Sequence, residues 1–383
     1  MKIVADENIP LLETFFRDFL GENGELYTCH GRNMTPEDVA DADMLLVRSI
    51  TQVNEKLLAG SQVRFVATAT SGTDHVDKKW LKNNNIGFSS AAGCNADAVV
   101  DYVLAALDNM TDEHGIQLQE RTVGIVGYGQ VGSRLYDRLK ALGVTCLVCD
   151  PFKEVPGGGI TMDDLVNWSD IISFHTPLTD SGPHPTFHIL DQDRLQRLRP
   201  GTILVNAGRG GVVDNNALKQ RLQEQNDIIA VLDVWEGEPE LDPELLDLVA
   251  IGTPHIAGYS VDGKVRGTAM IYQAACKYFG QPETIRFHEV VPAPSLRSLT
   301  MSEGVSPQIA ATMALKAVYD IRRDDRCLRQ AVRKHPDAIA REFDLLRRNY
   351  PKRREFSTLE VIMIDTHPAA NDPVAGLGFR ITE

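Results

Sequence analysis

The sequence predicts an α/β protein organised around a doubly wound parallel sheet. Two observations lead to this prediction. Apolar runs of strand length alternate with helix-patterned segments through most of residues 1–257. A glycine-rich turn also joins one of these strands to the helix after it, at residues 127–132. The chain has 383 residues, which is room for two or three domains.

The glycine-rich turn lies within a βαβ unit at residues 121–150. An apolar run is followed by Gly127, Gly129 and Gly132 in the spacing GxGxxG, then by a helical pattern and a second strand. Gly127 permits a tight turn, Gly129 leaves room for a pyrophosphate, and Gly132 lets the helix pack closely on the strand. The N-terminus of that helix attracts phosphates. We therefore expect a Rossmann dinucleotide-binding unit, with a glycine-rich turn of another α/β protein as the alternative.

Asp150 ends the second strand of this unit, where an acid reads the hydroxyls of the cofactor ribose. A carboxylate at this point repels the 2′-phosphate of NADP, so the sequence favours NAD as the cofactor. Residues 151–153 contain no arginine, and Lys153 is the residue that keeps NADP as an alternative.

The nucleotide-binding domain is expected at residues 94–257 and begins with a long helix at 96–109. Its expected strands are apolar runs at 123–126, 144–149, 171–175, 202–205, 228–232 and 248–252. Helical segments lie between most of these runs. This alternation predicts a parallel sheet with helices on both faces.

A second α/β domain, of flavodoxin-like type, is expected from residues 1–93 together with 258–285. Its expected strands lie at 2–5, 43–48, 63–69 and 86–89, with a helix at 10–20. A helix at 261–279 returns the chain to this domain and makes it discontinuous. Loops beyond the carboxyl ends of its strands are where such sheets bind ligands, so we expect it to bind the substrate.

The regular alternation of strand and helix patterns ends after residue 285. Residues 286–383 are expected to form a C-terminal α+β domain. A proline-marked segment at 290–294 leads into a basic helical region at 307–333. A helical stretch at 343–349 and a strand at 359–364 follow. This region has no nucleotide-binding motif, and its residues leave both a dimerisation role and a regulatory role open.

Charge and composition exclude several classes of protein. The chain is 43% hydrophobic and 24% charged, as soluble globular proteins are. Its net charge of −14 argues against a nucleic-acid partner. No apolar run approaches the length needed to span a membrane, and the first ten residues lack a signal pattern, so we expect a cytoplasmic protein without membrane contact.

The cysteines and acids predict no metal site. Cys146 and Cys149 form a CxxC pattern, but on an expected strand they point to opposite faces. Buried thiols are therefore favoured over a metal or redox site. Nowhere else does the sequence group His, Cys and acidic residues at metal-ligand spacing, so we expect no metal.

Three loops that follow expected strands carry the charged groups that hydride transfer from a 2-hydroxy acid needs. They hold Arg209, Glu238 and His255. Arginine binds a carboxylate bidentately, and histidine takes the hydroxyl proton as hydride leaves C2. A glutamate paired with the histidine fixes its tautomer. A surface ion pair, a turn acid and a core histidine are the respective structural alternatives. His75 is a rival catalytic histidine, for which we favour a structural turn.

These loops and the βαβ unit resemble the D-isomer-specific 2-hydroxyacid dehydrogenase family over residues 1–285, including the segments SGTDHVD and DNNAL. The resemblance implies that Arg209, Glu238 and His255 are catalytic. It implies that the cofactor contacts Gly127, Gly129, Gln130, Val131, Gly132, Asp150, Thr176, Ala207, Asp233 and Gly258.

One group within this family resembles the chain over nearly its whole length, through the segments CNA, VWEGEPE, HIAGY and YDIRRDD. Most of the family has two glycines after the His-Ile pair, whereas this chain has Ala-Gly-Tyr. The resemblance implies NAD-dependent oxidation of 4-phospho-D-erythronate in the synthesis of pyridoxal 5′-phosphate. It also implies a homodimer formed through the C-terminal region, and substrate contacts at Ser49, Thr70, Tyr259 and Arg209.

Two other functions stay open. Another dehydrogenase of the family, such as a 3-phosphoglycerate dehydrogenase, shares the catalytic trio and differs in its substrate loops. A non-catalytic NADH-sensing binding protein can use the same fold, although the complete trio argues against it. If the substrate is phosphorylated, we expect arginines of the C-terminal region to bind its phosphate across a dimer interface; these are Arg347, Arg348, Arg353 and Arg354.

Overall fold

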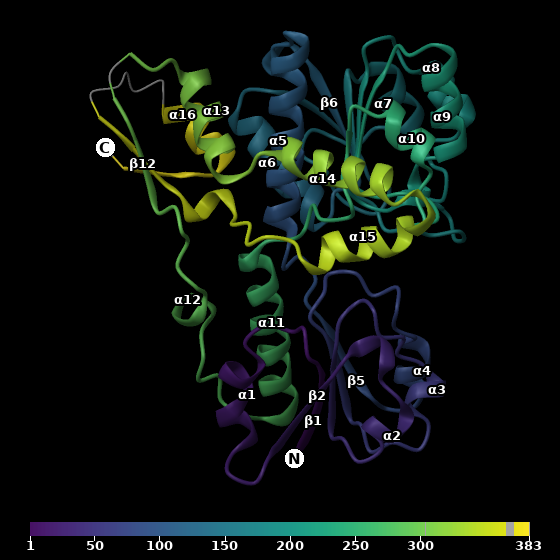
Figure 1. Cartoon of the computed structure of the whole chain (residues 1–383), viewed down its shortest axis with the longest axis vertical. Coiled ribbons are helices and arrows are strands. Elements are labelled where there is room, and N and C mark those ends of the chain that lie inside the picture. The colour runs from purple at the N-terminus through teal and green to yellow at the C-terminus, as the bar shows by residue number, and fades with distance from the viewer. Residues whose placement is uncertain (303, 365–370, 383) are drawn as a thin grey trace. The chain divides into compact units, whose positions relative to one another are not determined.

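The computed structural model of the chain describes residues 1–302, 304–364 and 371–382. The chain divides into two compact units (Figure 1). Unit 1 holds residues 1–96 and 260–293, and unit 2 holds residues 97–259 and 294–383. The C-terminal region thus groups with the nucleotide-binding sheet. The expected division into three domains, with its boundaries, stays a prediction.

Unit 1 is built on a five-stranded parallel sheet in the order β2-β1-β3-β4-β5. Its strands are β1 (Lys2–Asp6), β2 (Glu25–Cys29), β3 (Met44–Val47), β4 (Phe65–Thr68) and β5 (Gly87–Ser90). This strand order is the flavodoxin-like one, which confirms the predicted fold class. The sequence did not reveal β2, because this edge strand is largely exposed and lacks the apolar run of the central strands.

Helices cover both faces of the sheet of unit 1 (Figure 1). One face packs against α1 (Leu12–Leu20) and α11 (Val261–Phe279). The other face packs against α2 (Pro36–Val39), α3 (Glu55–Leu58) and α4 (Lys78–Asn83). The remaining short helices of this unit are η1 (Gly31–Asn33) and α12 (Phe287–Val290).

Unit 2 contains a six-stranded parallel sheet in the order β11-β10-β9-β8-β6-β7. Its strands are β6 (Thr122–Val126), β7 (Thr145–Cys149), β8 (Ile171–Phe174), β9 (Ile203–Asn206), β10 (Ile229–Leu232) and β11 (Ile251–Gly252). The chain runs from β6 to β7 on one side and returns to β8 on the other. The order in which strands are added to the sheet therefore reverses beside β6. A ligand site is expected at this point, beyond the carboxyl ends of β6 and β8.

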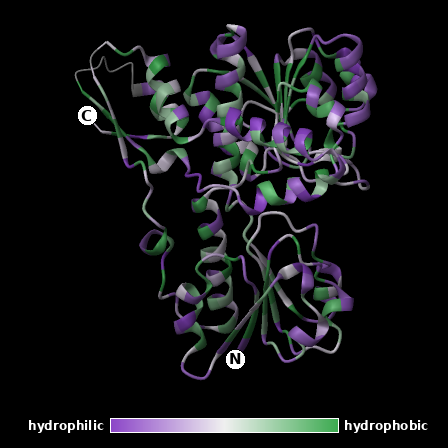
Figure 2. Ribbon diagram, in the orientation of Figure 1, coloured by the Kyte–Doolittle hydropathy of each residue, from purple (hydrophilic) through white to green (hydrophobic). Residues whose placement is uncertain are grey.

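The strands of this sheet are apolar on both faces, and successive residues serve different cores. Ile171 and Ile203 join the core under α5 (Ala96–His114) and α6 (Gln130–Ala141). Their neighbours Ile172 and Leu204 join the core on the opposite face. That face is covered by α7 (Met162–Trp168), α8 (Gln192–Arg197), α9 (Asn215–Glu224) and α10 (Pro243–Leu248). Figure 2 shows the strands in green and much of the helix surface in purple.

The helices that follow these strands begin at side-chain caps. Asp191, Asp214 and Asp242 each accept a hydrogen bond from a backbone N–H in the first turn of the next helix. Such caps satisfy donors that have no partner inside the helix. Each cap therefore fixes where the preceding loop ends.

In its described residues, the C-terminal region adds a three-stranded parallel sheet and four α-helices to unit 2 (Figure 1). Its strands are β12 (Ser298–Met301), β13 (Glu360–Met363) and β14 (Arg380–Thr382), and its helices are α13 (Pro307–Val318), α14 (Ile321–Lys334), α15 (Ile339–Arg348) and α16 (Asn371–Leu377). The expected helical region at 307–333 is two helices, because Asp320 caps a new helix at its start. Residues of α13 join the core beside α6, and residues of α14 and α15 join the core on the opposite face.

The described part of unit 2 also contains four single-turn helices: η2 (Leu118–Glu120), η3 (Gly210–Val212), η4 (Pro336–Ala338) and η5 (Phe356–Thr358). Among the described residues, no helix combines the length and the apolar character needed to cross a membrane.

Candidate active site

The glycine-rich turn has the geometry that the spacing predicts. Gly127 adopts a φ of 95°, and a side chain there would press against the His175 carbonyl at 2.9 Å. A side chain at Gly132 would collide with the carbonyl of Gly127. At Gly129, at the start of α6, a Cβ atom would point into open space. The turn is therefore closed on the protein side at Gly132 and open at Gly129, where a pyrophosphate needs room.

Asp150 and Thr176 lie beside this turn. The Asp150 carboxylate accepts hydrogen bonds from the backbone N–H groups of Tyr128, at 2.7 Å, and Phe152, at 2.9 Å. Thr176 follows β8, and its methyl group approaches Gly127. Its hydroxyl is buried without a hydrogen-bond partner among the described residues. A hydroxyl without a hydrogen-bond partner, a carboxylate at a strand end and an open glycine turn are features that suit the binding of a dinucleotide.

The other residues expected to contact the cofactor occupy the same edge of the sheet or the start of α6. Gln130 and Val131 form the first turn of α6. Ala207 follows β9 and Asp233 follows β10, each at the carboxyl end of its strand. Gly258 lies in the loop after β11. Their contact with a cofactor stays a prediction.

His255 and Glu238 form a hydrogen-bonded pair. The Nδ1 atom of His255 lies 2.5 Å from Oε1 of Glu238, and both side chains are partly buried, at 31% and 26% exposure. An ionised glutamate can only accept, so Nδ1 carries the proton. This pairing leaves Nε2 as the nitrogen that can accept a proton from a substrate.

The surroundings keep Glu238 ionised. Burial opposes its negative charge, but the hydrogen bond and charge of His255, the N–H group of Trp235 and the charge of Arg347 outweigh that effect. The pKa of Glu238 is therefore lowered below its ordinary value. A glutamate that stays ionised can stabilise a protonated imidazole beside it.

Asp233 holds the loop that carries His255. Its buried carboxylate accepts hydrogen bonds from the Thr253 hydroxyl at 2.6 Å, the Ile256 N–H at 2.8 Å and the Ala257 N–H at 2.9 Å. Burial raises the pKa of Asp233, and the nearby His255 and these donors oppose that shift. His255 itself has a φ of 54°, a left-handed conformation that non-glycine residues adopt where their neighbours fix it.

Arg209 lies in a loop that packs against the loop of Glu238. The Asn206 side chain donates to the Arg209 carbonyl at 2.9 Å and accepts from the Gly208 N–H at 3.1 Å, which shapes the turn. A Cβ atom at Gly210 would collide with the Trp235 carbonyl, so the two loops are in close contact. The structure therefore brings the loops of Arg209, Glu238 and His255 together at one edge of the sheet in unit 2.

A second His–Glu pair near these loops was missed by sequence reasoning. His188 Nε2 lies 2.6 Å from Glu236, whose other oxygen accepts from the Asn215 N–H at 2.9 Å. Within the described part of the chain, these two residues and Asp214 are the group whose ligand atoms lie close enough for a metal ion. Asp214 already caps α9. These bonds give the group a structural explanation, because they tie the loop after β10 to the start of α9.

The C-terminal region contributes residues beside Tyr259, which with Arg209 is an expected substrate contact in this unit. The Tyr350 ring meets the Tyr259 ring edge-on at 5.7 Å, and the Arg347 guanidinium lies 5.7 Å from the Tyr259 ring centroid. Arg353 is 5% exposed and donates to the Ala257 carbonyl. Burial leaves Arg353 unavailable to a substrate phosphate, which corrects our expectation for that arginine.

The remaining expected substrate contacts lie in unit 1. Ser49 is exposed after β3, and Thr70 follows the neighbouring strand β4, where it hydrogen-bonds to Thr68 at 2.8 Å. His75 is buried and lies 3.0 Å from the Thr68 hydroxyl. Burial lowers the pKa of His75, against the charge of Asp74. These contacts give His75 a structural role, in line with the reading that we favoured.

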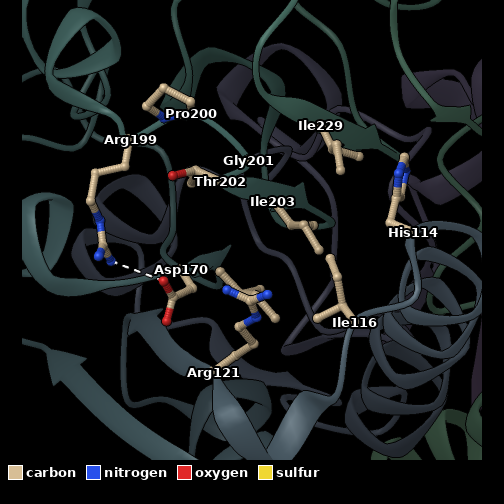
Figure 3. Close-up of a pocket in the computed structure, with 11 residues that line it drawn as sticks. His114, Ile116, Arg121, Asp170, Arg199, Pro200, Gly201, Thr202, Ile203 and Ile229 are labelled. Atoms are coloured by element: carbon tan, nitrogen blue, oxygen red, sulfur yellow. Dashed lines mark hydrogen bonds and ion pairs between the residues drawn. The ribbon is translucent and has the colours of Figure 1, made fainter.

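His175 also has a structural position, after β8 and against the glycine turn. It is partly buried, hydrogen-bonds to Ser173 at 2.9 Å, and desolvation lowers its pKa to about 3, so it stays neutral. A separate cavity of about 450 Å³ opens at the other edge of the sheet (Figure 3). Its lining includes Ile171, Ile203 and Ile229, the first residues of β8, β9 and β10, so it lies at the amino ends of the strands.

Comparisons with known proteins agree with this geometry. The family described as D-isomer specific 2-hydroxyacid dehydrogenase, NAD binding domain, matches residues 100–257, and a domain of unknown function matches residues 290–378. An erythronate-4-phosphate dehydrogenase of Pseudomonas syringae is 49% identical over 380 residues, 99% of each chain. That of Chromohalobacter salexigens is 47% identical over 388 residues, covering 100% of this chain and 99% of the relative.

Solved structures share the fold at lower identity. A D-lactate dehydrogenase from Aquifex aeolicus with NAD and lactic acid is 22% identical, with a TM-score of 0.61 over 73% of this chain and 96% of that one. An NAD⁺-bound 3-phosphoglycerate dehydrogenase from Entamoeba histolytica is 23% identical, with a TM-score of 0.64 over 73% of this chain and 95% of that one. Taken with the near full-length relatives, these findings show that the chain belongs to the D-isomer-specific 2-hydroxyacid dehydrogenase family, and within it to the erythronate-4-phosphate dehydrogenases.

Proposed function

We propose that the chain oxidises 4-phospho-D-erythronate to (R)-3-hydroxy-2-oxo-4-phosphooxybutanoate with NAD, as a step of pyridoxal 5′-phosphate biosynthesis. The observation that carries this proposal is the His255–Glu238 pair at 2.5 Å, formed between the loops that follow β10 and β11. The relatives that match nearly the whole chain at 47–50% identity, each named erythronate-4-phosphate dehydrogenase, supply the substrate. A match of this extent includes the C-terminal region as well as the trio.

Each member of the trio has a separate task in this proposal. Arg209 binds the C1 carboxylate of the substrate, since a guanidinium matches a carboxylate with two parallel hydrogen bonds. His255 accepts the proton of the C2 hydroxyl at Nε2, because its Nδ1–H is held by Glu238. Glu238 then stabilises the protonated imidazole. The pair thus provides a base that gains a proton without losing its orientation.

NAD would be held by the glycine turn, Asp150 and Thr176, and when bound it accepts the hydride that leaves C2. The residues of this chain determine where that cofactor lies. Asp150 is held by two backbone N–H groups, so its carboxylate is already oriented before a cofactor binds, which supports its proposed contact with the ribose. Asp233, proposed to lie near the nicotinamide end, is already held by the loop of His255.

The proposal extends to assembly and location. We propose a homodimer in the cytoplasm, with Ser49, Thr70 and Tyr259 as substrate contacts. The near full-length resemblance supports the dimer, because it includes the C-terminal region to which we assigned dimerisation. Light scattering of the purified protein at several concentrations tests it, and a monomer at micromolar concentration would contradict it.

Substrate preference tests the proposed reaction. NADH formation is followed at 340 nm with purified protein and NAD⁺, comparing 4-phospho-D-erythronate, 3-phospho-D-glycerate and D-lactate. We expect a strong preference for 4-phospho-D-erythronate. Preference for another acid would leave the proposed roles of the trio standing but would show that 4-phospho-D-erythronate is not the substrate. Tight NAD binding without turnover of any acid would favour an NADH-sensing protein.

A further inference from the structure

We propose that the C-terminal region, through residues 319–353, fixes the catalytic loop, residues 253–259, in the same subunit, with Arg353 as the main positioning residue. This gives a role in catalysis to a region that matches a domain of unknown function. The inference rests on the proposed function only in taking His255 as the base. All of its contacts lie within unit 2.

Arg353 reaches the catalytic loop from its buried position. Its Nη2 atom donates to the Ala257 carbonyl and, at 3.3 Å, to the Ala98 carbonyl at the start of α5. Its guanidinium lies 4.4 Å from the Tyr319 ring centroid and 5.9 Å from that of Tyr350. Only 5% of the residue is exposed. Nε and Nη1 are buried without a hydrogen-bond partner among the described residues, so the two hydrogen bonds of Nη2 and the two aromatic rings are the contacts that orient the guanidinium.

The loop is held from two sides at Ala257. Its N–H group donates to Asp233 at 2.9 Å, and its carbonyl accepts from Arg353. Ala257 lies two residues after His255, whose left-handed φ of 54° needs such support from its surroundings. Asp233 comes from the nucleotide-binding sheet and Arg353 from the C-terminal region. The conformation of His255 therefore depends on both.

The C-terminal region also holds the chain on either side of this loop. Before it, Asp325 accepts from the Gly252 N–H at 2.8 Å, and Arg329 donates to the Val249 carbonyl at 2.8 Å. After it, the Tyr259 ring lies against Tyr350, whose hydroxyl donates to the buried Asp324 at 2.6 Å. The three contacts leave the loop little freedom to shift as a body.

Arg347 adds an electrostatic contribution. Its guanidinium lies over the Tyr259 ring at 5.7 Å, and its positive charge helps to lower the pKa of Glu238. This charge disfavours protonation of the Glu238–His255 pair. Removing it should therefore move the acid limb of the rate profile to higher pH, an effect that a purely structural role in folding would not produce.

The test compares Arg353→Met and Arg353→Lys with Arg341→Met, a control on α15 whose side chain is 67% exposed. Hydrogen–deuterium exchange reports the mobility of residues 253–259 and requires no substrate. We expect peptides spanning 253–259 to exchange faster in Arg353→Met, with no change in Arg341→Met. We also expect kcat to fall by ~10- to 100-fold in Arg353→Met, as misplacement of a reacting group does, while the Kd for NADH and the oligomeric state stay unchanged. Arg353→Lys, which keeps the positive charge and a hydrogen-bond donor group, should recover part of the loss.

Several outcomes would overturn the inference. One is unchanged exchange of the loop in a folded Arg353→Met protein. Another is faster exchange spread over the whole of unit 2, or loss of the dimer alone. If Arg353→Met does not fold, Arg347→Gln is the variant that tests the inference. An acid limb that does not move in Arg347→Gln would show that the C-terminal region does not influence the Glu238–His255 pair. If the wild-type protein oxidises no 2-hydroxy acid, the proposed function fails. The hydrogen–deuterium exchange of residues 253–259 would still test whether Arg353 positions that loop.

Discussion

The Nδ1 atom of His255 lies 2.5 Å from Oε1 of Glu238, although 17 positions separate the two residues in the chain. The loops after β10 and β11 bring them together, and Asp233 holds the second loop by three hydrogen bonds. Because Glu238 fixes the proton at Nδ1, this contact leaves Nε2 of His255 as the atom that can accept the substrate proton. The predictions below test its consequences and those of the cofactor site.

Replacing His255 by alanine should lower kcat by at least ~10²-fold, because the general base is lost. The affinity for NADH, measured by fluorescence, should stay unchanged in this variant. In the wild-type enzyme kcat/KM for oxidation should fall on the acid side, since the base must start neutral. A profile that stays flat from about pH 6 to 9 would exclude His255 as the base.

Replacing Glu238 by glutamine removes the charge and leaves an acceptor for the Nδ1–H group. We expect kcat to fall by roughly 10- to 100-fold, within the range of acid–base contributions. The acid limb of kcat/KM should move to lower pH, because a carboxylate no longer stabilises the protonated imidazole. An unchanged acid limb, measured over the same buffers as the wild type, would mean that the pair does not act as a unit.

Glu238 should also make stability depend on pH. Its folded-state pKa is lowered, so its contribution to the free energy of unfolding is present above the unfolded-state pKa of about 4.3 and is lost as pH falls through the folded-state value. Thermal melts of the wild type and Glu238→Gln should therefore differ most near neutral pH and converge in acid. A difference in Tm that grows toward acid pH would contradict the direction of this shift.

Sequence reasoning found the parts of the site that depend on local pattern. The glycine spacing identified the turn at Gly127, and strand-length apolar runs placed Glu238 and His255 just beyond strand ends. It could not find the contacts of Arg353 with Ala257 or of His188 with Glu236, because these join residues 96 and 48 positions apart. No periodicity marks such pairs. The strands β2, β12 and β14 were also missed, because short or exposed strands carry little apolar signal, whereas β13 lies within the strand predicted at 359–364.

Replacing Asp150 by serine should weaken the preference for NAD over NADP. The carboxylate beside the glycine turn repels a 2′-phosphate, and removal of one charge at close range should change the ratio of kcat/KM values by roughly tenfold. Asp137→Ser, at an exposed acid of α6, is the matched control. An unchanged ratio in Asp150→Ser would show that another residue selects the cofactor.

The thiols of the CxxC pattern should be unreactive. Burial raises the pKa of Cys146 to about 11 and also raises the pKa of Cys149, whereas Cys327 is exposed. We expect one fast-reacting thiol in native protein treated with a disulfide reagent, and Cys327→Ser should abolish it. Rapid loss of two thiols with a new Cys146–Cys149 disulfide would instead support a redox role.

A single-turnover experiment tests most directly whether His255 is the base in the oxidation of 4-phospho-D-erythronate. Enzyme in excess over 4-phospho-D-erythronate is mixed with saturating NAD⁺, and NADH is followed at 340 nm in the wild type and in His255→Ala. The account predicts that the wild type converts the substrate in one fast phase and that His255→Ala forms no NADH over the same period, although it binds the cofactor. Equal NADH formation by the two proteins, or none by a wild type that binds NAD⁺, would contradict it.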